Sequence, residues 1–366
     1  MYSSNQIKLK KVILSVTNDL NTDQRVDKVA NSLLDNGFSV LLVGRKIRNW
    51  SSPLRSRAYD CHRFSLVFKK GFLFYLEFNI RLFFFLLFTK SDILLSNDLD
   101  TLLPNFLVSK LKTKKLVYDS HELFVEVPEL IHRPMVKRIW LWIERFCLPR
   151  IKHAYTVSDS IANYYREKYN INMLVVRNFP FFKKVDVECN HNYKKIIYQG
   201  AVNKDRGVDL MIASMKYVDA KLYIAGTGDV LDNMTNYVQK LNIHKKVIFL
   251  GQIPFQELSK ITQSSDLGLS FEEDTCLAYR YSLPNKIFDY IHAEIPVLIS
   301  NLPEFTKIIQ KYDVGMVLSS RVPKEVASQI NTLLSMDKDS VSSKLKLAKK
   351  DLCWENEEKK LLTLFM

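Results

Sequence analysis

Several features that would point to other classes of protein are scarce in this sequence. The five cysteines are far apart and form no Cys-x-x-Cys pair: Cys61, Cys147, Cys189, Cys276 and Cys353. That spacing argues against a zinc site and against a disulfide scaffold, and it fits a reducing cytoplasm. The segment Met1–Lys11 is polar and then basic. Because it lacks an apolar core, we expect no secretion signal.

Glycine is also scarce, with ten residues in the chain, and seven of them lie beyond residue 180. Gly200, Gly226 and Gly251 each follow a short apolar run that predicts a strand. Glycine at a strand end permits a positive φ angle or the close approach of a backbone to a ligand. Ordinary strand-to-helix turns are the alternative explanation.

Acidic residues are too few to balance the basic residues of the first half. Residues 1–180 contain 28 Lys and Arg against 16 Asp and Glu, a net charge of +12, whereas the remainder contains 25 against 23, a net charge of +2. A basic half indicates an anionic partner, which is either nucleic acid or an anionic membrane surface.

A long unbroken hydrophobic run is absent as well. The aromatic-rich segment 72–88 is interrupted by Glu77, Asn79 and Arg81, which argues against a plain transmembrane span. An aromatic helix flanked by lysines suits the plane of a membrane interface, and a buried helix of the first domain is the alternative. Because the aromatic residues are grouped with leucine, lipid is favoured over single-stranded nucleic acid.

Short apolar runs alternate with segments of helical spacing along the chain. A length of 366 residues with 47% hydrophobic residues suits two globular domains. The alternation predicts an α/β fold with two doubly wound, Rossmann-like parallel sheets. We expect a first domain at 1–180, a linker at 181–192, a second domain at 193–345 and a C-terminal helix at 346–366. The predicted strands are 11–16, 39–44, 92–96, 115–119, 154–158, 174–178, 195–200, 221–226, 247–251, 267–270 and 296–299.

The stretch 281–290, Tyr-Ser-Leu-Pro-Asn-Lys-Ile-Phe-Asp-Tyr, predicts a loop that enters a short helix. Pro284 or Asn285 would open the helix, because proline suits a first helical position. Lys286 would then lie in the first turn beside unpaired backbone N–H groups, which is a good receiver for a diphosphate. Asp289, on the same face, could accept hydrogen bonds from a ribose. A surface ion pair between Lys286 and Asp289 is the alternative.

Four further segments belong to the same pattern: Tyr198–Gly207, Ile224–Gly228, Phe249–Leu258 and Trp354–Leu364. Together with 281–290 they resemble the GT4-type family of retaining glycosyltransferases, over nearly the whole chain. The resemblance implies the GT-B fold, with two such domains facing across a cleft and a C-terminal helix that crosses back to the first domain. The donor and nucleotide-binding residues that it implies are Gly200, Arg206, Gly226, Gly251, Ile253, Ser282, Leu283, Pro284, Lys286 and Asp289.

Three positions depart from the family pattern. Arg206 stands where the family usually has a diphosphate-binding lysine, and Glu294 stands where it usually has glycine. The family also has two glutamates seven residues apart. Asp289 matches the second, ribose-binding glutamate, but Tyr281 lies eight residues before it. The nearest acids before that position are Glu272, Glu273 and Asp274, and we expect a loop insertion to return Glu273 to the catalytic site as the first carboxylate.

In the first half, Val117–Glu122 resembles the family segment whose histidine lies beside the reacting sugar. His121 is therefore the predicted catalytic residue, which hydrogen-bonds a sugar hydroxyl or orders the acceptor. A structural histidine at a strand end is the alternative. Asp23 could instead cap the first helix, and Arg25 could be a solvated side chain. The predicted acceptor-side residues are Asp23, Arg25, Asp98 and Glu122.

Asp98-Leu99-Asp100 has the Asp-x-Asp spacing that can bind a divalent cation on a nucleotide sugar. We predict no metal there, because the motif follows a strand of the first domain, away from the diphosphate site. Lys286, Arg206 and helix-end amides would neutralise the leaving diphosphate instead. We also predict no cofactor, since the nucleotide sugar is a substrate.

These expectations combine into one predicted activity. A hexosyl group would pass from a nucleotide diphosphate-sugar to a lipid-linked or saccharide acceptor, with retention at the anomeric carbon and without metal. The basic, aromatic first half favours the cytoplasmic face of a bacterial membrane, in cell-surface polysaccharide or glycolipid synthesis, with no nucleic acid. The alternatives are a nucleotide-sugar 2-epimerase of similar fold and a non-enzymatic basic protein that binds membrane or nucleic acid. A non-enzymatic basic protein would leave residues 282–289 without a role.

Overall fold

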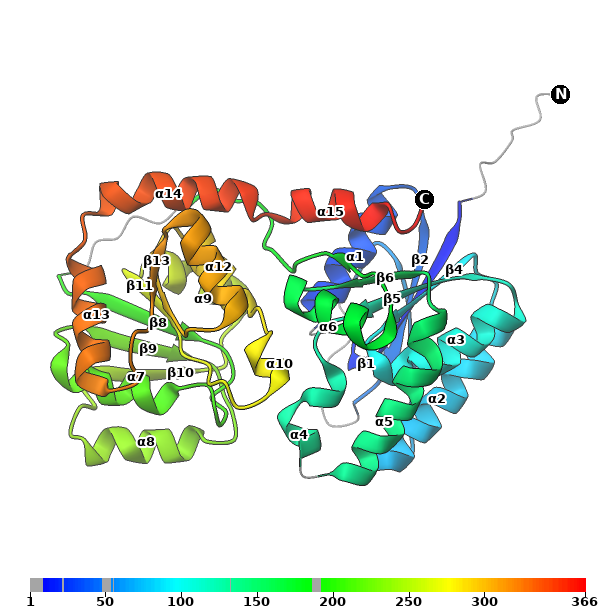
Figure 1. Ribbon diagram of the computed structural model, residues 1–366, viewed down its shortest axis with the longest axis horizontal. Helices are drawn as coiled ribbons and strands as arrows, with labels where there is room; N and C mark the ends of the chain where they lie inside the picture. Colours follow the sequence, from blue (N-terminus) through cyan, green and yellow to red (C-terminus); the bar gives the residue numbers. More distant parts are fainter. Residues whose placement is uncertain (1–8, 22, 48–53, 55, 132, 186–191) are drawn as a thin grey trace. The chain divides into compact units, whose positions relative to one another are not determined.

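The computed structural model describes residues 9–21, 23–47, 54, 56–131, 133–185 and 192–366. The chain forms two compact units (Figure 1). The first unit comprises the chain up to Arg177 together with Glu357–Met366, and the second comprises Asn178–Asn356. Part of the predicted linker, residues 186–191, lies outside the described residues.

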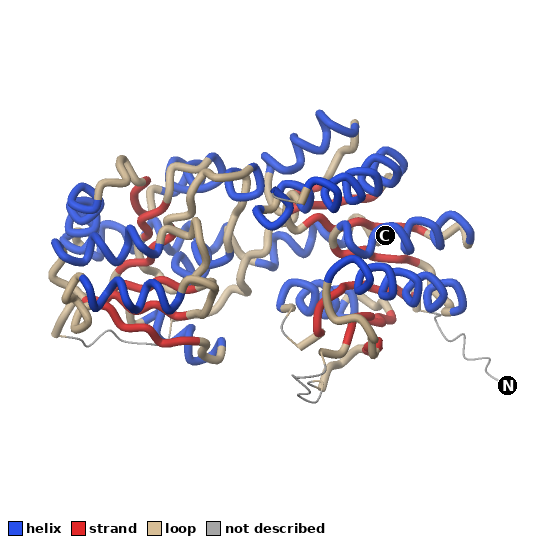
Figure 2. Tube along the Cα trace, turned by 90° about the horizontal axis from the view of Figure 1, so that it is seen from below, coloured by secondary structure: helices blue, strands red, loops and turns tan. Residues whose placement is uncertain are grey.

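The first unit contains a seven-stranded parallel sheet in the order β3-β2-β1-β4-β5-β6-β7. Figure 2 shows the strands of this unit as a layer with helices on both sides. The strands are β1 Lys11–Asp19, β2 Ser39–Arg45, β3 Asp60–Phe64, β4 Ile93–Asn97, β5 Lys115–Ser120, β6 His153–Thr156 and β7 Leu174–Val175. The helices are α1 Gln24–Asp35, α2 Gly71–Phe88, α3 Leu102–Leu111, α4 Pro128–Ile131, α5 Pro134–Cys147 and α6 Asp159–Tyr169.

The second unit contains a six-stranded parallel sheet in the order β10-β9-β8-β11-β12-β13. Its strands are β8 Lys195–Gln199, β9 Lys221–Ala225, β10 Val247–Gly251, β11 Leu267–Ser270, β12 Val297–Ile299 and β13 Gly315–Val317. Its helices are α7 Val208–Ser214, α8 Leu231–Lys240, α9 Phe255–Gln263, α10 Leu277–Arg280, α11 Asn285–His292, α12 Pro303–Tyr312, α13 Pro323–Ser335 and α14 Lys338–Asp351. Two clusters of buried side chains form its core, one around α7 and α13 and the other around α11 and α12.

The apolar runs form the central strands because helices cover both faces of each sheet. In β1, Val12, Ile13 and Leu14 are all fully buried, and successive side chains point to opposite faces. Parallel strands that are buried on both faces therefore have unbroken apolar sequences. The predicted pair of doubly wound α/β sheets is confirmed.

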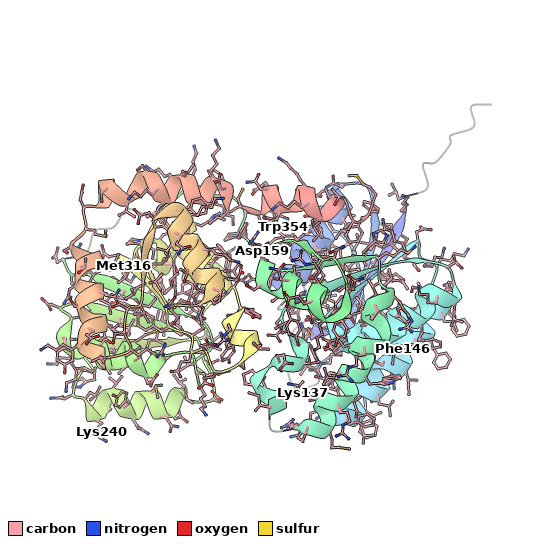
Figure 3. The ribbon with its side chains drawn as sticks, viewed as in Figure 1. Lys137, Phe146, Asp159, Lys240, Met316 and Trp354 are labelled. Carbon is pink, nitrogen blue, oxygen red and sulfur yellow. The ribbon has the colours of Figure 1, made fainter. Side chains whose placement is uncertain are left out.

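The C-terminal segment returns to the first unit, as predicted. Helix α15 (Trp354–Leu362) starts with a fully buried tryptophan, labelled in Figure 3. Beyond it, the Phe365 ring packs against Phe38 at 6.3 Å between centroids, and Lys115 Nζ donates to the Met366 carbonyl oxygen at 2.9 Å. The prediction of one helix at 346–366 is wrong. Two helices cover this segment, since α14 ends at Asp351 and α15 begins at Trp354.

Helix α2 buries only one narrow stripe of its surface. Phe74, Phe78, Leu82 and Leu86 are buried at four-residue intervals, so they lie on one face of the helix. By length and composition α2 is apolar enough to cross a membrane, and 22% of it is buried inside the structure. The alternative of a buried helix of the first domain therefore holds for one face of α2 only, and contact of the exposed remainder with a membrane interface stays a prediction.

Candidate functional site

Two glycine loops meet at the carboxyl edge of the six-stranded sheet. Gly200 follows β8 with φ +137°, and Gly226 follows β9 with φ +147°, angles that side-chain-bearing residues rarely adopt. A Cβ atom on Gly226 would also collide with the carbonyl oxygen of Gly200. Only glycine therefore allows the two loops to approach each other this closely.

Helix α11 presents Lys286 at the same edge. The helix begins at Asn285 after an extended Pro284, as predicted, and no side chain caps its first turn. Lys286 Nζ lies 2.7 Å from Glu272 Oε1 and 4.2 Å from the centre of the Tyr198 ring. The side chain is only 8% exposed. The surface pair with Asp289 is therefore wrong as an explanation of Lys286.

Glu272, two residues beyond β11, is the buried acid of this cluster. Ser270 Oγ donates to its Oε2 at 2.6 Å, and Arg206 Nη1 lies 3.7 Å from its Oε1. Burial raises the pKa of Glu272, but the charge of Lys286 and the hydrogen bonds outweigh burial and lower it. One carboxylate thus faces two cations, which leaves the cluster with one net positive charge.

Arg206 retains unused hydrogen-bonding capacity. Its guanidinium lies 4.7 Å from the centre of the Tyr279 ring. Within the described part of the chain, its Nε is buried without a hydrogen-bond partner. A buried donor of this kind is costly unless it is satisfied, so a bound anion is a fitting partner for it.

The geometry favours Glu272 over the predicted Glu273 as the carboxylate of the site. Glu273 Oε1 pairs with Arg321 Nη2 at 2.9 Å, and its backbone N–H donates to the Asp205 carbonyl at 2.9 Å. Consecutive side chains at the end of an extended strand point to opposite sides. Only one of the two glutamates can therefore reach Lys286. Glu272 is two residues after Ser270 and points to the same side of the strand, and this spacing identifies it as the glutamate of the site.

Asp289 belongs to a second polar chain at this edge. Gln199 Nε2 donates to Asp289 Oδ2 at 2.6 Å, and Thr262 Oγ1 donates to Gln199 Oε1 at 2.8 Å. Gln199 therefore orients the carboxylate that the sequence assigns to a ribose, and neither Gln199 nor Thr262 was predicted as a site residue.

The other predicted donor residues surround these two clusters. A Cβ atom on Gly200 would lie 3.4 Å from Lys286 Nζ, and Gly226 N–H donates to the Gly251 carbonyl at 2.8 Å. Ser282 Oγ donates to the Tyr279 carbonyl, Leu283 packs against the core beneath α11, and Ile253 is half-buried. For Ser282, Leu283 and Ile253 a nucleotide-binding role stays a prediction.

The carboxyl edge of the seven-stranded sheet carries a chain of alternating charges. Arg25 donates from Nε to Asp119 Oδ2 at 3.0 Å and from Nη2 to Oδ1 at 2.8 Å. His121 Nε2 lies 2.8 Å from Asp119 Oδ2, and its Nδ1 lies 3.1 Å from Asp98 Oδ2. The order Arg25, Asp119, His121, Asp98 therefore alternates cation and anion, and the chain is neutral overall.

The alternating partners decide the charges of this chain. Burial lowers the pKa of His121, but Asp119 and Asp98 outweigh it and raise that pKa well above its usual value. Burial raises the pKa of Asp119, but Arg25 and His121 outweigh it and hold that pKa far below its usual value. At neutral pH the histidine is thus a cation and the aspartate an anion.

Two of the predicted acceptor-side residues have structural partners. Asp23 caps α1, because its Oδ1 accepts the Val26 N–H at 3.1 Å, and this confirms the capping alternative. Arg25 is buried against Asp119, so the alternative of a solvated side chain is wrong, and its role as an acceptor or phosphate contact stays a prediction. Glu122 is exposed, and its acceptor role stays a prediction.

The two carboxylates of the Asp-x-Asp motif bond to different partners. Asp98 has φ +60° and ψ 171°, a conformation that is almost confined to glycine, and its N–H donates to the Asp119 carbonyl at 2.8 Å. Asp100 is buried and accepts a 2.5 Å hydrogen bond from Thr17 Oγ1. Burial, with the neighbouring charge of Asp98, raises the pKa of Asp100 to about 7.

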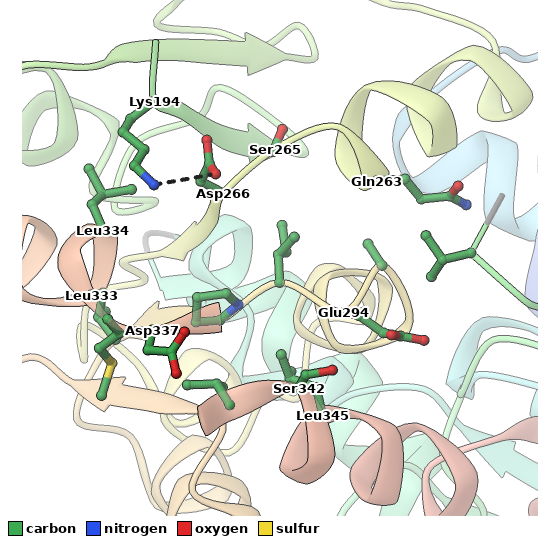
Figure 4. A pocket seen from close by; sticks show the side chains of 16 residues that line it. Lys194, Gln263, Ser265, Asp266, Glu294, Leu333, Leu334, Asp337, Ser342 and Leu345 are labelled. Atoms are coloured by element: carbon green, nitrogen blue, oxygen red, sulfur yellow. Dashed lines mark ion pairs between the residues drawn. The ribbon is translucent and has the colours of Figure 1, made fainter. Parts of the chain in front are cut away.

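A cavity of about 230 Å³ lies at the opposite edge of the six-stranded sheet (Figure 4). Lys194, Asp266 and Pro296, which line it, directly precede β8, β11 and β12. The Lys194–Asp266 ion pair that Figure 4 marks has an N···O distance of 3.9 Å. The cavity is therefore separate from the glycine loops and from Lys286, which lie at the carboxyl ends of the strands.

Comparison with known families covers most of the chain. Residues 23–179 match Glycosyltransferase Family 4, and residues 181–349 match Glycosyl transferases group 1. An uncharacterized glycosyltransferase of Methanocaldococcus jannaschii is 24% identical over 209 residues, which are 54% of this chain and 50% of the relative. The chitobiosyldiphosphodolichol beta-mannosyltransferase of Candida albicans is 22% identical over 166 residues, which are 43% and 35%. The chain spans half or less of the length of these curated relatives.

Solved structures resemble the fold along nearly the whole chain. Sucrose-phosphate synthase from Thermosynechococcus elongatus has a TM-score of 0.79 at 13% identity, covering 97% of this chain and 98% of that one. Anabaena HepE, in complex with UDP and glucose, has a TM-score of 0.75 at 12% identity, covering 97% and 99%. WaaG, a glycosyltransferase involved in lipopolysaccharide biosynthesis, has a TM-score of 0.72 at 14% identity, covering 96% and 99%. These likenesses confirm the predicted GT-B fold. The two family matches, which together cover most of the chain, establish that it belongs to the group 1, or GT4, family of glycosyltransferases.

Proposed function

We propose that the protein is a retaining glycosyltransferase that moves a sugar from a nucleotide diphosphate-sugar to an acceptor. The observation that carries the proposal is the cluster of Lys286, Arg206 and Glu272 beside the uncapped first turn of α11. Its one net positive charge and the N–H groups of Asn285 and Lys286 in the first turn suit the charge of a diphosphate. That HepE was solved with UDP and glucose supports a nucleotide-sugar donor.

The proposed reaction needs no metal, because side chains supply the positive charge. The bond between the anomeric carbon and the phosphate oxygen breaks, and the acceptor oxygen bonds to the same face of the sugar. The departing phosphate oxygen takes the proton of the acceptor hydroxyl. Lys286 and Arg206 stabilise the charge that develops on the diphosphate, which is where such groups contribute most to the rate.

Nucleotide binding tests the proposal directly. We expect one of UDP, GDP, ADP and dTDP to raise the melting temperature in the presence of EDTA, because a ligand that binds the folded form stabilises it. Lys286→Ala should reduce that shift. Lys344→Ala is the matched control, since Lys344 on α14 forms an exposed ion pair with Asp313, the residue that follows α12. If no nucleotide stabilises the wild type, with or without Mn²⁺, the proposal is refuted.

The acceptor that we propose is lipid-linked. Helices α2, α3 and α5 pack together in the first unit and leave large apolar side chains exposed (Figure 1). The most exposed include Phe72, Phe84, Phe88, Leu111, Met135 and Trp142. Figure 3 labels Phe146 and Lys137 on α5, where Arg138 and Arg145 are exposed among the apolar residues. An apolar helix face with interspersed cations suits an anionic membrane surface.

The remaining parts of the proposal concern where the enzyme works and what it builds. The enzyme would work at the cytoplasmic side of a bacterial membrane and build a cell-surface polysaccharide or glycolipid. The Candida albicans relative is named as a mannosyltransferase for chitobiosyldiphosphodolichol, which favours a hexosyl group and a lipid-linked acceptor. A 2-epimerase, by contrast, would change its nucleotide sugar in the absence of any acceptor.

Vesicle flotation tests the membrane part. We expect the wild type to float with vesicles containing anionic phosphatidylglycerol, and less so at high salt or with neutral vesicles. Phe84→Ser with Trp142→Ser should reduce flotation, because both side chains are exposed on the proposed face. Leu347→Ser, on α14 of the other unit, is the control. Equal flotation of all three proteins would refute this face as the membrane contact.

A further inference from the structure

His121 has a carboxylate against each of its ring nitrogens. Nε2 lies 2.8 Å from Asp119 Oδ2, and Nδ1 lies 3.1 Å from Asp98 Oδ2. A neutral imidazole has one N–H donor and one acceptor, whereas an ionised carboxylate only accepts. A ring between two carboxylates can therefore satisfy both of them only when both of its nitrogens carry a proton.

The surroundings do not offset this pair of anions at the histidine. The charged or titratable groups around the ring are Arg25 from α1, Asp98 and Asp100 from the segment after β4, Tyr118 and Asp119 from β5, and Tyr155 from β6. Arg25 bonds to both oxygens of Asp119 and shares Oδ2 with His121 Nε2, so the charge of Asp119 is divided between the two cations. Asp98 and His121 form the ion pair at the solvent-exposed end of this row of charged side chains.

Exposure separates the roles within this outer pair. Asp119 is fully buried, whereas the side chains of Asp98 and His121 are 24% and 22% exposed. Both ring nitrogens of His121 are engaged by carboxylate oxygens. Asp98 Oδ1 accepts the His121 backbone N–H at 2.9 Å, and each carboxylate oxygen has a second lone pair for another donor.

We propose that His121 is a positioning residue, a permanent imidazolium that fixes Asp98, and that Asp98 accepts a hydrogen bond from a hydroxyl of the sugar substrate. The inference rests on the proposed function. Four contacts among the described residues hold Asp98 in place: the ring and the backbone N–H of His121, the Asp119 carbonyl that its own N–H reaches at 2.8 Å, and the Ser96 hydroxyl, which donates to the Asp98 carbonyl at 3.3 Å. They hold a backbone conformation with φ +60° that L-residues seldom adopt. In this arrangement His121 takes no proton from the acceptor.

Nitrogen NMR of the histidine rings tests the state of His121 without any substrate. His121→Gln assigns its signals, and His62 and His153 are internal references, because burial lowers the pKa of both. We expect both His121 nitrogens to stay protonated from about pH 5.5 to about pH 8.5, a range across which an ordinary histidine becomes neutral. Loss of a ring proton from His121 within that range would overturn the inference.

Asp98→Asn tests the role of the carboxylate. The amide keeps the shape, but it removes the charge that faces His121, so the pKa of His121 should fall in the same NMR titration. We expect KM for the sugar acceptor or donor to rise about tenfold or more, the range for losing a hydrogen bond to a charged group. The melting-temperature shift with nucleotide should persist, because Lys286 and Arg206 are untouched. An unchanged KM and kcat would overturn the role of Asp98.

The failure of the inference and that of the proposed function are distinguishable. If the wild type transfers sugar and His121 titrates as an ordinary histidine, only the inference fails. If no nucleotide binds and no sugar is transferred while His121 stays protonated, the proposed function fails and Asp98 loses its assigned substrate. A wild-type kcat/KM that shows no ionisation of His121 across pH 6–8 would agree with the inference.

Discussion

Replacing Lys286 by methionine should destabilise the second unit, because it leaves the Glu272 carboxylate buried without its nearest cation. Lys286 is 8% exposed and Glu272 is 1% exposed, and their charged atoms are 2.7 Å apart. Removing one partner of a buried ion pair costs about 3–5 kcal/mol of unfolding free energy. Arg206 at 3.7 Å and the Ser270 hydroxyl still face Glu272, so we expect about 3 kcal/mol.

The loss of stability in Lys286→Met should depend on pH and on a second substitution, Glu272→Gln. Without Lys286, burial dominates and the pKa of Glu272 rises above that of the unfolded chain. A carboxyl group whose folded pKa is raised loses stability as pH rises, so Lys286→Met should be more harmful at pH 8 than at pH 5. Adding Glu272→Gln removes the stranded charge, so the double variant should be more stable than Lys286→Met alone by about 1–3 kcal/mol.

Urea denaturation followed by circular dichroism measures these differences at both pH values. Lys344→Met, at the exposed pair with Asp313, is the control and should change the unfolding free energy by less than about 1 kcal/mol. If Lys286→Met were as stable as the control at pH 8, the buried pair would not contribute as the geometry implies. If the double variant were less stable than Lys286→Met, the stranded-charge argument would be refuted.

Three further predictions concern other buried groups. Asp100→Asn should raise the unfolding free energy by about 4 kcal/mol at pH 8 and by less than half of that at pH 5. The reason is that the folded pKa of Asp100, about 7, exceeds the unfolded value by about 3 units. Equal effects at pH 5 and pH 8 in urea titrations would contradict this prediction. Gly226→Ala should lower the melting temperature more than Gly37→Ala does, since both glycines have positive φ but only the Cβ on Gly226 meets another backbone; equal losses in calorimetry would rule out the collision. Arg25→Met should cost about 3–5 kcal/mol in urea unfolding, because it strands the buried Asp119, and a loss below about 1 kcal/mol would show that His121 suffices.

Most of the fold could be predicted because its signals are local. Each buried parallel strand has a continuous apolar run, and these runs mark all the central strands of both sheets. The missed strands lie at the sheet edges. Strand β3 reads Asp-Cys-His-Arg-Phe and is buried only at Phe64, and β13 has three half-buried residues. Strand β3 contains no apolar run to detect, and the run around β13 is the short Val-Gly-Met-Val-Leu at 314–318.

The candidate site was predictable only where one segment determines it. Lys286 follows from the proline that opens its own helix, and that placement is confirmed. Arg25 and Asp119 are 94 residues apart, so their pairing depends on the strand order that brings the start of α1 to the end of β5. The choice between Glu272 and Glu273 depends on the side to which β11 directs each side chain. The apolar face of α5 was missed because its exposed apolar residues alternate with Arg138 and Arg145.

The charged clusters at the two carboxyl edges, Lys286 with Arg206 and Glu272 in the second unit and Arg25 to Asp98 in the first, differ in net charge, and the difference suits the two kinds of substrate proposed. In the second unit Lys286 and Arg206 face the single carboxylate of Glu272, which leaves one positive charge for a diphosphate. In the first unit Arg25 and His121 are balanced by Asp119 and Asp98, as their hydrogen bonds and the raised pKa of His121 require. A balanced chain attracts no net charge, but it offers a fixed carboxylate to a hydroxyl group. The same residue types, paired in different ratios, would therefore bind an anionic donor at one sheet edge and an uncharged hydroxyl at the other.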